Sequence, residues 1–249
     1  MGKIKNKLIV SGPCAVEKKS QLYNTVKHIC NYTDIIRAGI WKGRTSPNSY
    51  PGVGEKALPW IQDIQNQYQI PVAIEVGNTR HVELALKYDI KIMWLGARTT
   101  VNPFAVQDIA ESVRNLNIEI WIKNPIVSDL KLWIGAINRF HRVGVKNIKT
   151  IHRGFYSDNN IHYRNQPRWD LLNSFKKRYS EIPVLSDPSH LTGDTKHVEK
   201  LSLESLKEGI DGFMFEVHNN PHKALSDEKQ QLNPKDFKTL IDQLTIKCN

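Results

Sequence analysis

The chain has 249 residues, of which 40% are hydrophobic and 24% charged, and its formal net charge is +10. This length fits one (β/α)8 barrel, for which about 250 residues is typical, and the composition is that of a globular domain. No apolar run reaches the roughly 18 residues of a membrane helix and no signal-peptide core follows Met1, so we expect no membrane partner. Three cysteines are too few for a disulfide framework and favour the reducing cytoplasm.

Short apolar runs alternate with amphipathic segments along the whole chain. The predicted strands are nearly continuously hydrophobic, as in a parallel sheet covered on both faces, and they lie near 7–13, 35–40, 71–76, 91–96, 119–123, 147–152, 183–187 and 212–217. The predicted helices have apolar residues three to four positions apart, and they lie near 18–31, 55–68, 79–88, 104–116, 128–142, 168–179, 196–208 and 234–244. Eight such units predict an α/β fold, a single closed (β/α)8 TIM barrel rather than an open doubly wound sheet. The two longest connections are expected to be 43–54 and 219–233, both on one rim.

Each predicted strand is followed by a charged or metal-capable side chain that a strand end does not need for stability. In a closed barrel these positions converge on the rim where active sites lie. The residues are, in chain order, Cys14, Arg37 with Lys42, Glu75, Arg98, Lys123, Arg153, Asp187 with His190, and Glu216.

A metal site is predicted where strands 7, 8 and 1 meet. Closure of the barrel makes these strands neighbours, and their ends carry His190, Glu216 and Cys14, with Asp227 in the connection after strand 8. A thiolate, an imidazole and two carboxylates suit a divalent metal such as Mn, Fe, Co or Zn. Cys14 or His190 alone could be an ordinary buried residue, but four such residues together favour a metal.

A second group of residues predicts binding of phosphorylated molecules. Arg98, Lys123 and Arg153 close consecutive strands and repel one another unless an anion lies between them. Further donors of the same kind follow strand 2, namely Arg37, Lys42, Arg44, Thr45 and Ser46. Two anion sites beside a metal imply two phosphorylated substrates or one bisphosphate. The scattered lysines and the lack of a DNA- or RNA-binding motif make nucleic acid the less favoured explanation of the charge.

Together these residues resemble the 3-deoxy-D-arabino-heptulosonate 7-phosphate (DAHP) synthase family, also called phospho-2-dehydro-3-deoxyheptonate aldolases. The resemblance extends from Gly12 to about Leu232 and is specific as a set rather than motif by motif. Its motifs are Gly12-Pro13-Cys14 with Glu17, Lys42-Gly43-Arg44-Thr45-Ser46-Pro47, Gly96-Ala97-Arg98, Lys123, Arg153-Gly154, Asp187-Pro188-Ser189-His190, Glu216-Val217-His218, Asn220-Pro221 and Ala224-Leu225-Ser226-Asp227.

The resemblance implies a role for each of these residues. The implied metal ligands are Cys14, His190, Glu216 and Asp227. The implied phosphoenolpyruvate residues are Arg37, Lys42, Arg98, Lys123 and Arg153, and the implied erythrose 4-phosphate residues are Arg44, Thr45 and Ser46. Asp187 is expected to help bind substrate, Lys42, Lys123 and His190 to act in catalysis, and Glu75 to order the water or the cations. The implied enzyme is a cytoplasmic homo-oligomer that makes DAHP in the first step of the shikimate pathway.

The chain looks most similar to the branch whose members often carry a C-terminal chorismate mutase. Only 245–249 follow the last predicted helix, so we expect residues 1–249 to be one catalytic domain without a mutase or separate regulatory domain. Two residues depart from the family pattern: Gly43 stands where proline is usual, and His152 where glutamate is usual. These departures bear on substrate geometry rather than on reaction type.

Three alternatives remain open at the level of sequence. The first is 3-deoxy-D-manno-octulosonate 8-phosphate synthase, which performs the same chemistry on arabinose 5-phosphate but lacks the Lys-x-Arg-Thr-Ser loop. The second is a Schiff-base aldolase that uses Lys123, and the third is a non-catalytic basic barrel that binds phosphate or nucleic acid.

Overall fold

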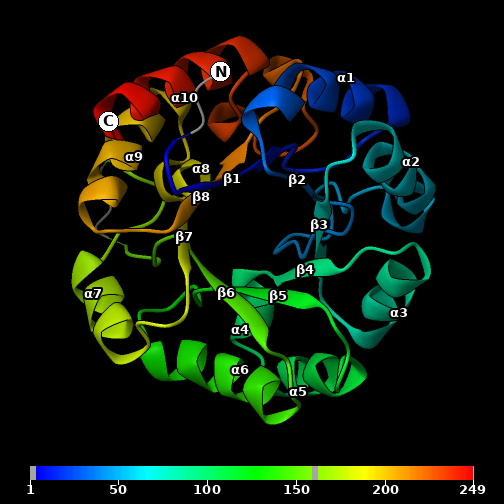
Figure 1. Cartoon of the computed structure of the whole chain (residues 1–249), viewed down its shortest axis with the longest axis vertical. Coiled ribbons are helices and arrows are strands. Elements are labelled where there is room, and N and C mark those ends of the chain that lie inside the picture. Colours follow the sequence, from blue (N-terminus) through cyan, green and yellow to red (C-terminus); the bar gives the residue numbers. More distant parts are fainter. Residues whose placement is uncertain (1–3, 159–161, 249) are drawn as a thin grey trace.

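The computed structural model, which describes residues 4–158 and 162–248, is built on eight parallel strands that close into a barrel (Figure 1). Each strand pairs with its neighbours in sequence, and β1 pairs with β8 in a register that places Gly12 opposite Glu216. The strands are β1 (Leu8–Gly12), β2 (Ile35–Ala38), β3 (Val72–Val76), β4 (Ile92–Leu95), β5 (Glu119–Lys123), β6 (Asn147–His152), β7 (Val184–Ser186) and β8 (Gly212–Glu216). The predicted (β/α)8 barrel is therefore confirmed.

Helices form a ring around the barrel (Figure 1). The outer helices are α1 (Lys19–Ile29), α2 (Leu58–Tyr68), α3 (Thr79–Lys87), α5 (Pro103–Ser112), α6 (Leu130–Arg142), α7 (Trp169–Arg178), α9 (Val198–Lys207) and α10 (Pro234–Cys248). Two short helices that the sequence pattern did not indicate, α4 (Ala97–Thr100) and α8 (Pro188–Thr192), follow β4 and β7 directly. None of the helices among the described residues is both long and apolar enough to cross a membrane.

Two hydrophobic layers hold the barrel together. The inner layer takes one buried residue from each strand, in chain order Val10, Ile35, Ala73, Trp94, Trp121, Ile151, Leu185 and Met214. Two tryptophans on neighbouring strands fill much of the interior, so the barrel is a packed core and not a pore. The outer layer lies between strands and helices, where Trp133 of α6 stacks on Phe175 of α7 with ring centroids 4.5 Å apart. Strand residues thus alternate between the two layers, which explains their nearly continuous hydrophobicity.

Candidate active site

A polar pocket lies at the carboxyl ends of the strands. Its lining includes eight residues singled out in the sequence, namely Lys42, Arg44, Glu75, Arg98, Lys123, Arg153, His190 and Asp227. Arg164, Gly43, Gly96 and Ala97 complete the lining. A Cβ at Gly96 would lie 2.2 Å from Oε1 of Glu75, so a side chain there would displace the Glu75 carboxylate. The missing side chain lets Glu75 form part of the pocket wall.

The three cations that end β4, β5 and β6 do come together in this pocket. Lys123 Nζ lies 2.7 Å from Oδ2 of Asp187, which is the single ion pair of this group among the described residues. Arg153 Nη1 donates to Oδ1 of Asn165 at 2.8 Å, and Arg98 Nε donates to Oγ1 of Thr45 at 3.1 Å. Both arginines are thus held by neutral groups, so their charges are left for another anion. Burial lowers the pKa of Arg153 to about 10 and also lowers the pKa of Lys123.

The loop after β2 reaches across the pocket to both groups of residues. Lys42 Nζ donates to the carbonyl of Cys14 at 3.1 Å and lies 3.3 Å from its sulfur. Arg44 Nη1 pairs with Oδ2 of Asp227 at 3.0 Å, and Thr45 meets Arg98. Ser46 does not join the pocket lining, because its exposed hydroxyl accepts instead from the backbone N–H of Asn48.

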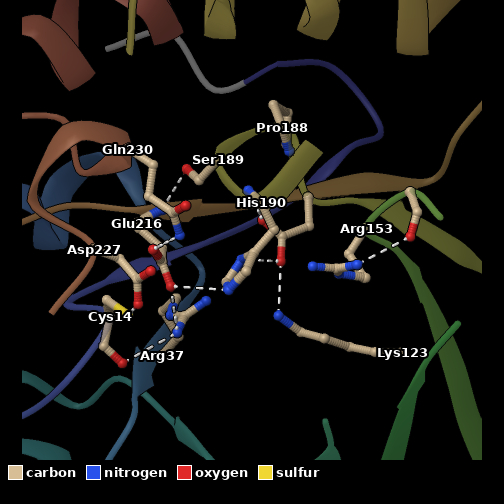
Figure 2. Close-up of polar contacts among 12 residues, drawn as sticks. Cys14, Arg37, Lys123, Arg153, Pro188, Ser189, His190, Glu216, Asp227 and Gln230 are labelled. Atoms are coloured by element: carbon tan, nitrogen blue, oxygen red, sulfur yellow. Dashed lines mark hydrogen bonds and ion pairs between the residues drawn. The ribbon is translucent and has the colours of Figure 1, made fainter. Parts of the chain in front are cut away.

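The four predicted metal ligands also meet, but as two pairs. Cys14 Sγ lies 3.3 Å from Oδ2 of Asp227, and His190 Nε2 lies 3.6 Å from Oε1 of Glu216. Figure 2 shows these side chains together on one side of His190, with Lys123 and Arg153 on the other. In the part of the chain that the structure describes, no three Cys, His, Asp or Glu side chains are already arranged to hold a metal ion.

Local backbone structure explains how Cys14 and His190 reach the site. Gly12 has φ 150° and its Cβ position lies 2.2 Å from the carbonyl oxygen of Arg37, so only glycine fits before the turn that carries Cys14. Asp187 caps α8 by accepting from the N–H of His190 at 3.1 Å, while its Oδ2 lies 2.8 Å from His190 Nδ1. The same Oδ2 binds Lys123, so Asp187 joins the two groups from outside the pocket lining.

The chemistry of these donors fits a divalent transition metal. Burial lowers the pKa of His190, which favours the neutral ring, and because Nδ1 lies 2.8 Å from Oδ2 of Asp187, a proton on Nδ1 would leave the lone pair on Nε2. That lone pair then faces the Glu216 carboxylate, and a cation between them would relieve their repulsion. Burial raises the pKa of Cys14 to about 12, but coordination to a metal deprotonates a thiol outright.

Asp227 and Arg37 are also paired with charged residues of the site. Burial opposes the charge of Asp227, but His190, Arg164 and Arg44 outweigh it and hold the pKa of Asp227 far below its usual value. Arg37 is completely buried outside the pocket lining, where it pairs with Oε1 of Glu216 at 3.0 Å. The structure therefore places Arg37 against a predicted metal ligand, although the sequence assigned it to phosphoenolpyruvate.

Arg164, Asn165 and Gln230 are polar residues of the site that sequence reasoning missed. The first two lie in the connection between β6 and α7, which follows His152 and ends before Trp169. Gln230 follows Asp227 closely and donates to Oε2 of Glu216 at 2.6 Å. For Arg164 and Asn165, the sequence offered only their position as a signal. They lie in the connection that follows β6, and this connection must start at the active-site rim, beside Arg153.

Comparisons with known proteins agree with this geometry. The sequence profile of the DAHP synthetase I family matches residues 1–247. A phospho-2-dehydro-3-deoxyheptonate aldolase from Thermotoga maritima is 30% identical over 237 residues, which cover 95% of this chain and 68% of the relative. A 2-dehydro-3-deoxyphosphooctonate aldolase from Desulfotalea psychrophila is 26% identical over 259 residues, covering 95% of this chain and 88% of the relative.

A solved structure agrees as well. The crystal structure of the Thermotoga maritima DAHP synthase superposes with a TM-score of 0.86 at 27% identity. The match covers 97% of this chain and 69% of that chain.

Proposed function

Because this chain belongs to the DAHP synthetase I family, we propose that it condenses phosphoenolpyruvate with erythrose 4-phosphate in a metal-dependent reaction. The products are DAHP and inorganic phosphate. The chain is an aldolase-type transferase by its relatives, and the substrates and the metal are the parts proposed here. The observation that carries the proposal is the pair of arginines, Arg98 and Arg153, that converge in one pocket and have only neutral hydrogen-bond partners among the described residues.

Phosphoenolpyruvate fits the cation group because it carries a phosphate and a carboxylate on the same carbon atom. Arg98 and Arg153 offer planar guanidinium groups that can each bind two oxygens, and Lys123 offers a point charge. Binding the anion would relieve the mutual repulsion of these cations without breaking the Lys123–Asp187 ion pair. Lys42, which has no carboxylate partner among the described residues, is well placed to hold the second anionic group.

Erythrose 4-phosphate fits the loop after β2. Arg44 lines the pocket, and the exposed Thr45 lies beside it, where its hydroxyl accepts from Arg98 at 3.1 Å. Arg44 is paired with Asp227 in the structure, so binding the aldose phosphate requires exchange of one anionic partner for another. The hydrogen bond from Arg98 to Thr45 joins a residue proposed to bind phosphoenolpyruvate to one proposed to bind the aldose phosphate. A condensation of two substrates requires the two binding sites to lie side by side in this way.

The proposed reaction makes one carbon–carbon bond and one carbon–oxygen bond, and breaks one carbon–oxygen bond. The alkene carbon of phosphoenolpyruvate attacks the aldehyde carbon, whose oxygen takes up a proton. Water adds to the carbon that bears the phosphate ester, and phosphate then leaves from that carbon by C–O cleavage. Lys42 and Lys123 would hold and move protons near the enol carboxylate and phosphate, and Glu75 would order the water. The cations lower the barrier chiefly by holding two anions side by side.

A divalent metal would be held by Cys14, His190, Glu216 and Asp227. When bound, it supplies a Lewis acid for the aldehyde oxygen. The chemistry of the four donors supports this proposal, as argued above, and does not select among Mn, Fe, Co and Zn. The homo-oligomer, the cytoplasmic location and the lack of a separate regulatory or chorismate mutase domain stay predictions.

Arabinose 5-phosphate is the competing substrate, because relatives named 2-dehydro-3-deoxyphosphooctonate aldolase also match over 95% of the chain. The deciding experiment measures phosphate release from phosphoenolpyruvate with each aldose phosphate, with and without added Mn²⁺. We expect a higher kcat/KM with erythrose 4-phosphate. A preference for the pentose would move the chain to the competing function while leaving the fold and the metal site unchanged.

Lys123 also allows a test of the Schiff-base alternative. Burial lowers the pKa of Lys123, which favours a nucleophilic amine, but Asp187 opposes that effect and binds Nζ at 2.7 Å, where a Schiff base would have to form. We therefore expect borohydride with substrate to leave the chain unmodified and a chelator to abolish turnover. Covalent trapping at Lys123 together with full activity in chelator would overturn the metal-dependent mechanism.

A further inference from the structure

The two carboxylates among the predicted metal ligands are linked through one arginine and one glutamine. Arg164 Nη1 donates to Oδ1 of Asp227 at 2.9 Å and to Oε1 of Gln230 at 2.6 Å. Gln230 Nε2 in turn donates to Oε2 of Glu216 at 2.6 Å, the contact drawn in Figure 2. One continuous chain of hydrogen bonds therefore runs from Asp227 to Glu216.

This chain of hydrogen bonds uses one oxygen of each carboxylate and leaves the other facing the remaining metal donors. Oε1 of Glu216 faces His190 Nε2 at 3.6 Å and is also the oxygen that pairs with Arg37, at 3.0 Å. Oδ2 of Asp227 faces Cys14 Sγ at 3.3 Å. The oxygens bound by Arg164 and Gln230 are Oδ1 and Oε2, so the two sets do not overlap.

Arg164 itself is fixed by the helix that carries His190. Its backbone N–H donates to the carbonyl of Thr192 at 3.0 Å, at the end of α8. Gly193, at φ 71°, has no room for a side chain because its Cβ would lie 2.6 Å from Cβ of Arg164. The next residue, Asn165, donates to the carbonyl of His190 at 2.7 Å. Arg164 and His190 are thus placed by the same short segment.

We propose that Arg164 and Gln230 are positioning residues for the metal site. They hold Asp227 and Glu216 by their outer oxygens, so that Oδ2 and Oε1 are presented together to one ion. This inference rests on the proposed function, because it assumes that Cys14, His190, Glu216 and Asp227 bind a metal. Outer contacts of this kind orient metal ligands, and their loss typically costs roughly 10- to 100-fold in metal affinity.

The charges around Asp227 support a positioning role over a purely structural one. Arg44 binds the inner oxygen of Asp227 and Arg164 binds the outer one. If Asp227 turned Oδ2 to a metal, Arg44 would be released for the aldose phosphate while Arg164 kept its contact. The carboxylate would then stay oriented throughout the exchange. Gln230 is buried and adds no charge, so it ties Glu216 to Arg164 without competing for the ion.

The test is a titration of the metal-free, full-length protein with Co²⁺, followed by its visible absorption and by thermal unfolding. Arg164→Ala and Gln230→Met should each raise the Kd for Co²⁺ by roughly 10- to 100-fold. Arg164→Lys, which keeps one charged donor, should recover part of the loss. Unfolding temperatures without metal should stay close to that of the unmodified protein, while the stabilisation by Co²⁺ should shrink.

Arg168→Ala is the matched control. Arg168 lies in the same connection, pairs with Asp170 rather than Asp227, and has a side chain 43% exposed against 39% for Arg164. Its Co²⁺ affinity should be unchanged. Tight Co²⁺ binding by Arg164→Ala and Gln230→Met would overturn the inference and leave the proposed function intact. Failure of the unmodified protein to bind Co²⁺ would instead overturn the metal site itself. If Gln230→Met does not fold, Arg164→Ala, which alters a partly exposed side chain, decides the question.

Discussion

The charged residues on the two sides of the active-site rim have opposite kinds of partner. On the side of β7, β8 and β1, each carboxylate is bound by cations: Arg37 pairs with Glu216, and Arg44 and Arg164 pair with Asp227. On the side of β4, β5 and β6, Arg98 and Arg153 are held by a hydroxyl and an amide. Figure 2 shows His190 between the two sides.

This difference indicates where each ligand belongs. Carboxylates already surrounded by cations can exchange those cations for a metal ion, because the charge of the group changes little. Arg153 gains most from an anion, since it is buried and a buried charge without a charged partner is costly, whereas Arg98 is exposed. Asp187 joins the sides by binding both His190 and Lys123, so metal and anion sites are fixed relative to each other.

Loss of the metal should produce the largest effect, and it tests whether the carboxylate side of the rim binds a metal ion. Cys14→Ala should lower metal affinity by more than the roughly 10- to 100-fold expected when Arg164 or Gln230 is replaced, because it removes a ligand itself. It should also abolish nearly all turnover. The unfolding temperature without metal should change little. Metal affinity measured by Co²⁺ titration, with turnover in chelator as the control, checks this. Full activity in strong chelator would contradict it.

Arg153→Ala tests the cation side. A hydrogen bond to a charged group contributes about 1.5–3 kcal/mol, so affinity for phosphoenolpyruvate should fall roughly 10- to 150-fold. Affinity for the aldose phosphate should change much less. Calorimetric binding of each substrate gives the two numbers, and Arg142→Ala, an exposed arginine of α6, serves as the control. Equal loss for both substrates would mean that the cluster is structural.

Arg44→Ala tests the loop that reaches both sides. We expect kcat/KM for erythrose 4-phosphate to fall at least about tenfold, because a charge-assisted contact to phosphate is lost. Metal affinity should be retained, since Arg164 still holds Asp227. Arg44→Lys should recover part of the activity. If the variant lost affinity for phosphoenolpyruvate alone, Arg44 would be a phosphoenolpyruvate residue and not an erythrose 4-phosphate residue.

His152 lies next to Arg153 on the cation side of the rim, and its neutral ring adds no further positive charge there. Burial lowers the pKa of His152 to about 4, and Arg153 nearby acts in the same direction. The folded state therefore stays neutral while the unfolded state gains a proton below about pH 6.5, which favours unfolding as pH falls. From pH 7 to pH 5 this costs about 2 kcal/mol of unfolding free energy, and the loss ends near pH 4.

His152→Gln should remove that loss. Urea unfolding of both proteins at pH 7 and pH 5 measures it, and the difference between the proteins cancels the other titrating groups. An identical acid loss in the two proteins would show that His152 does not titrate as described.

Gly43→Pro should have the smallest effect. A Cβ at Gly43 would meet no atom within 4 Å, so the proline usual in the family has space on that side. Where the backbone is compatible, such a change stabilises a protein by about 0.4–1 kcal/mol through the unfolded state. Thermal unfolding and kcat/KM for erythrose 4-phosphate check this. A large fall in kcat/KM would show that the loop needs the freedom of glycine.

Much of the site could be predicted because a barrel turns strand ends into a common rim. His190, Lys123 and Arg153 needed only the position of their strands to be placed in one pocket. Ser46 lies outside the pocket lining with its hydroxyl toward Asn48, and its role in substrate binding stays a prediction. Arg164 went unnoticed, because a connection without periodic pattern does not reveal which side chain returns to the rim.

The sequence by itself determined the barrel, since each hydrophobic run is long enough for one strand or one helix face and the order of units leaves few topologies. It also determined which chemical groups stand at the rim. Only the tertiary structure decided how those groups pair. Contacts such as Arg164 to Asp227 and Arg98 to Thr45 join residues far apart in the chain, and their geometry depends on how the loops pack over the closed barrel.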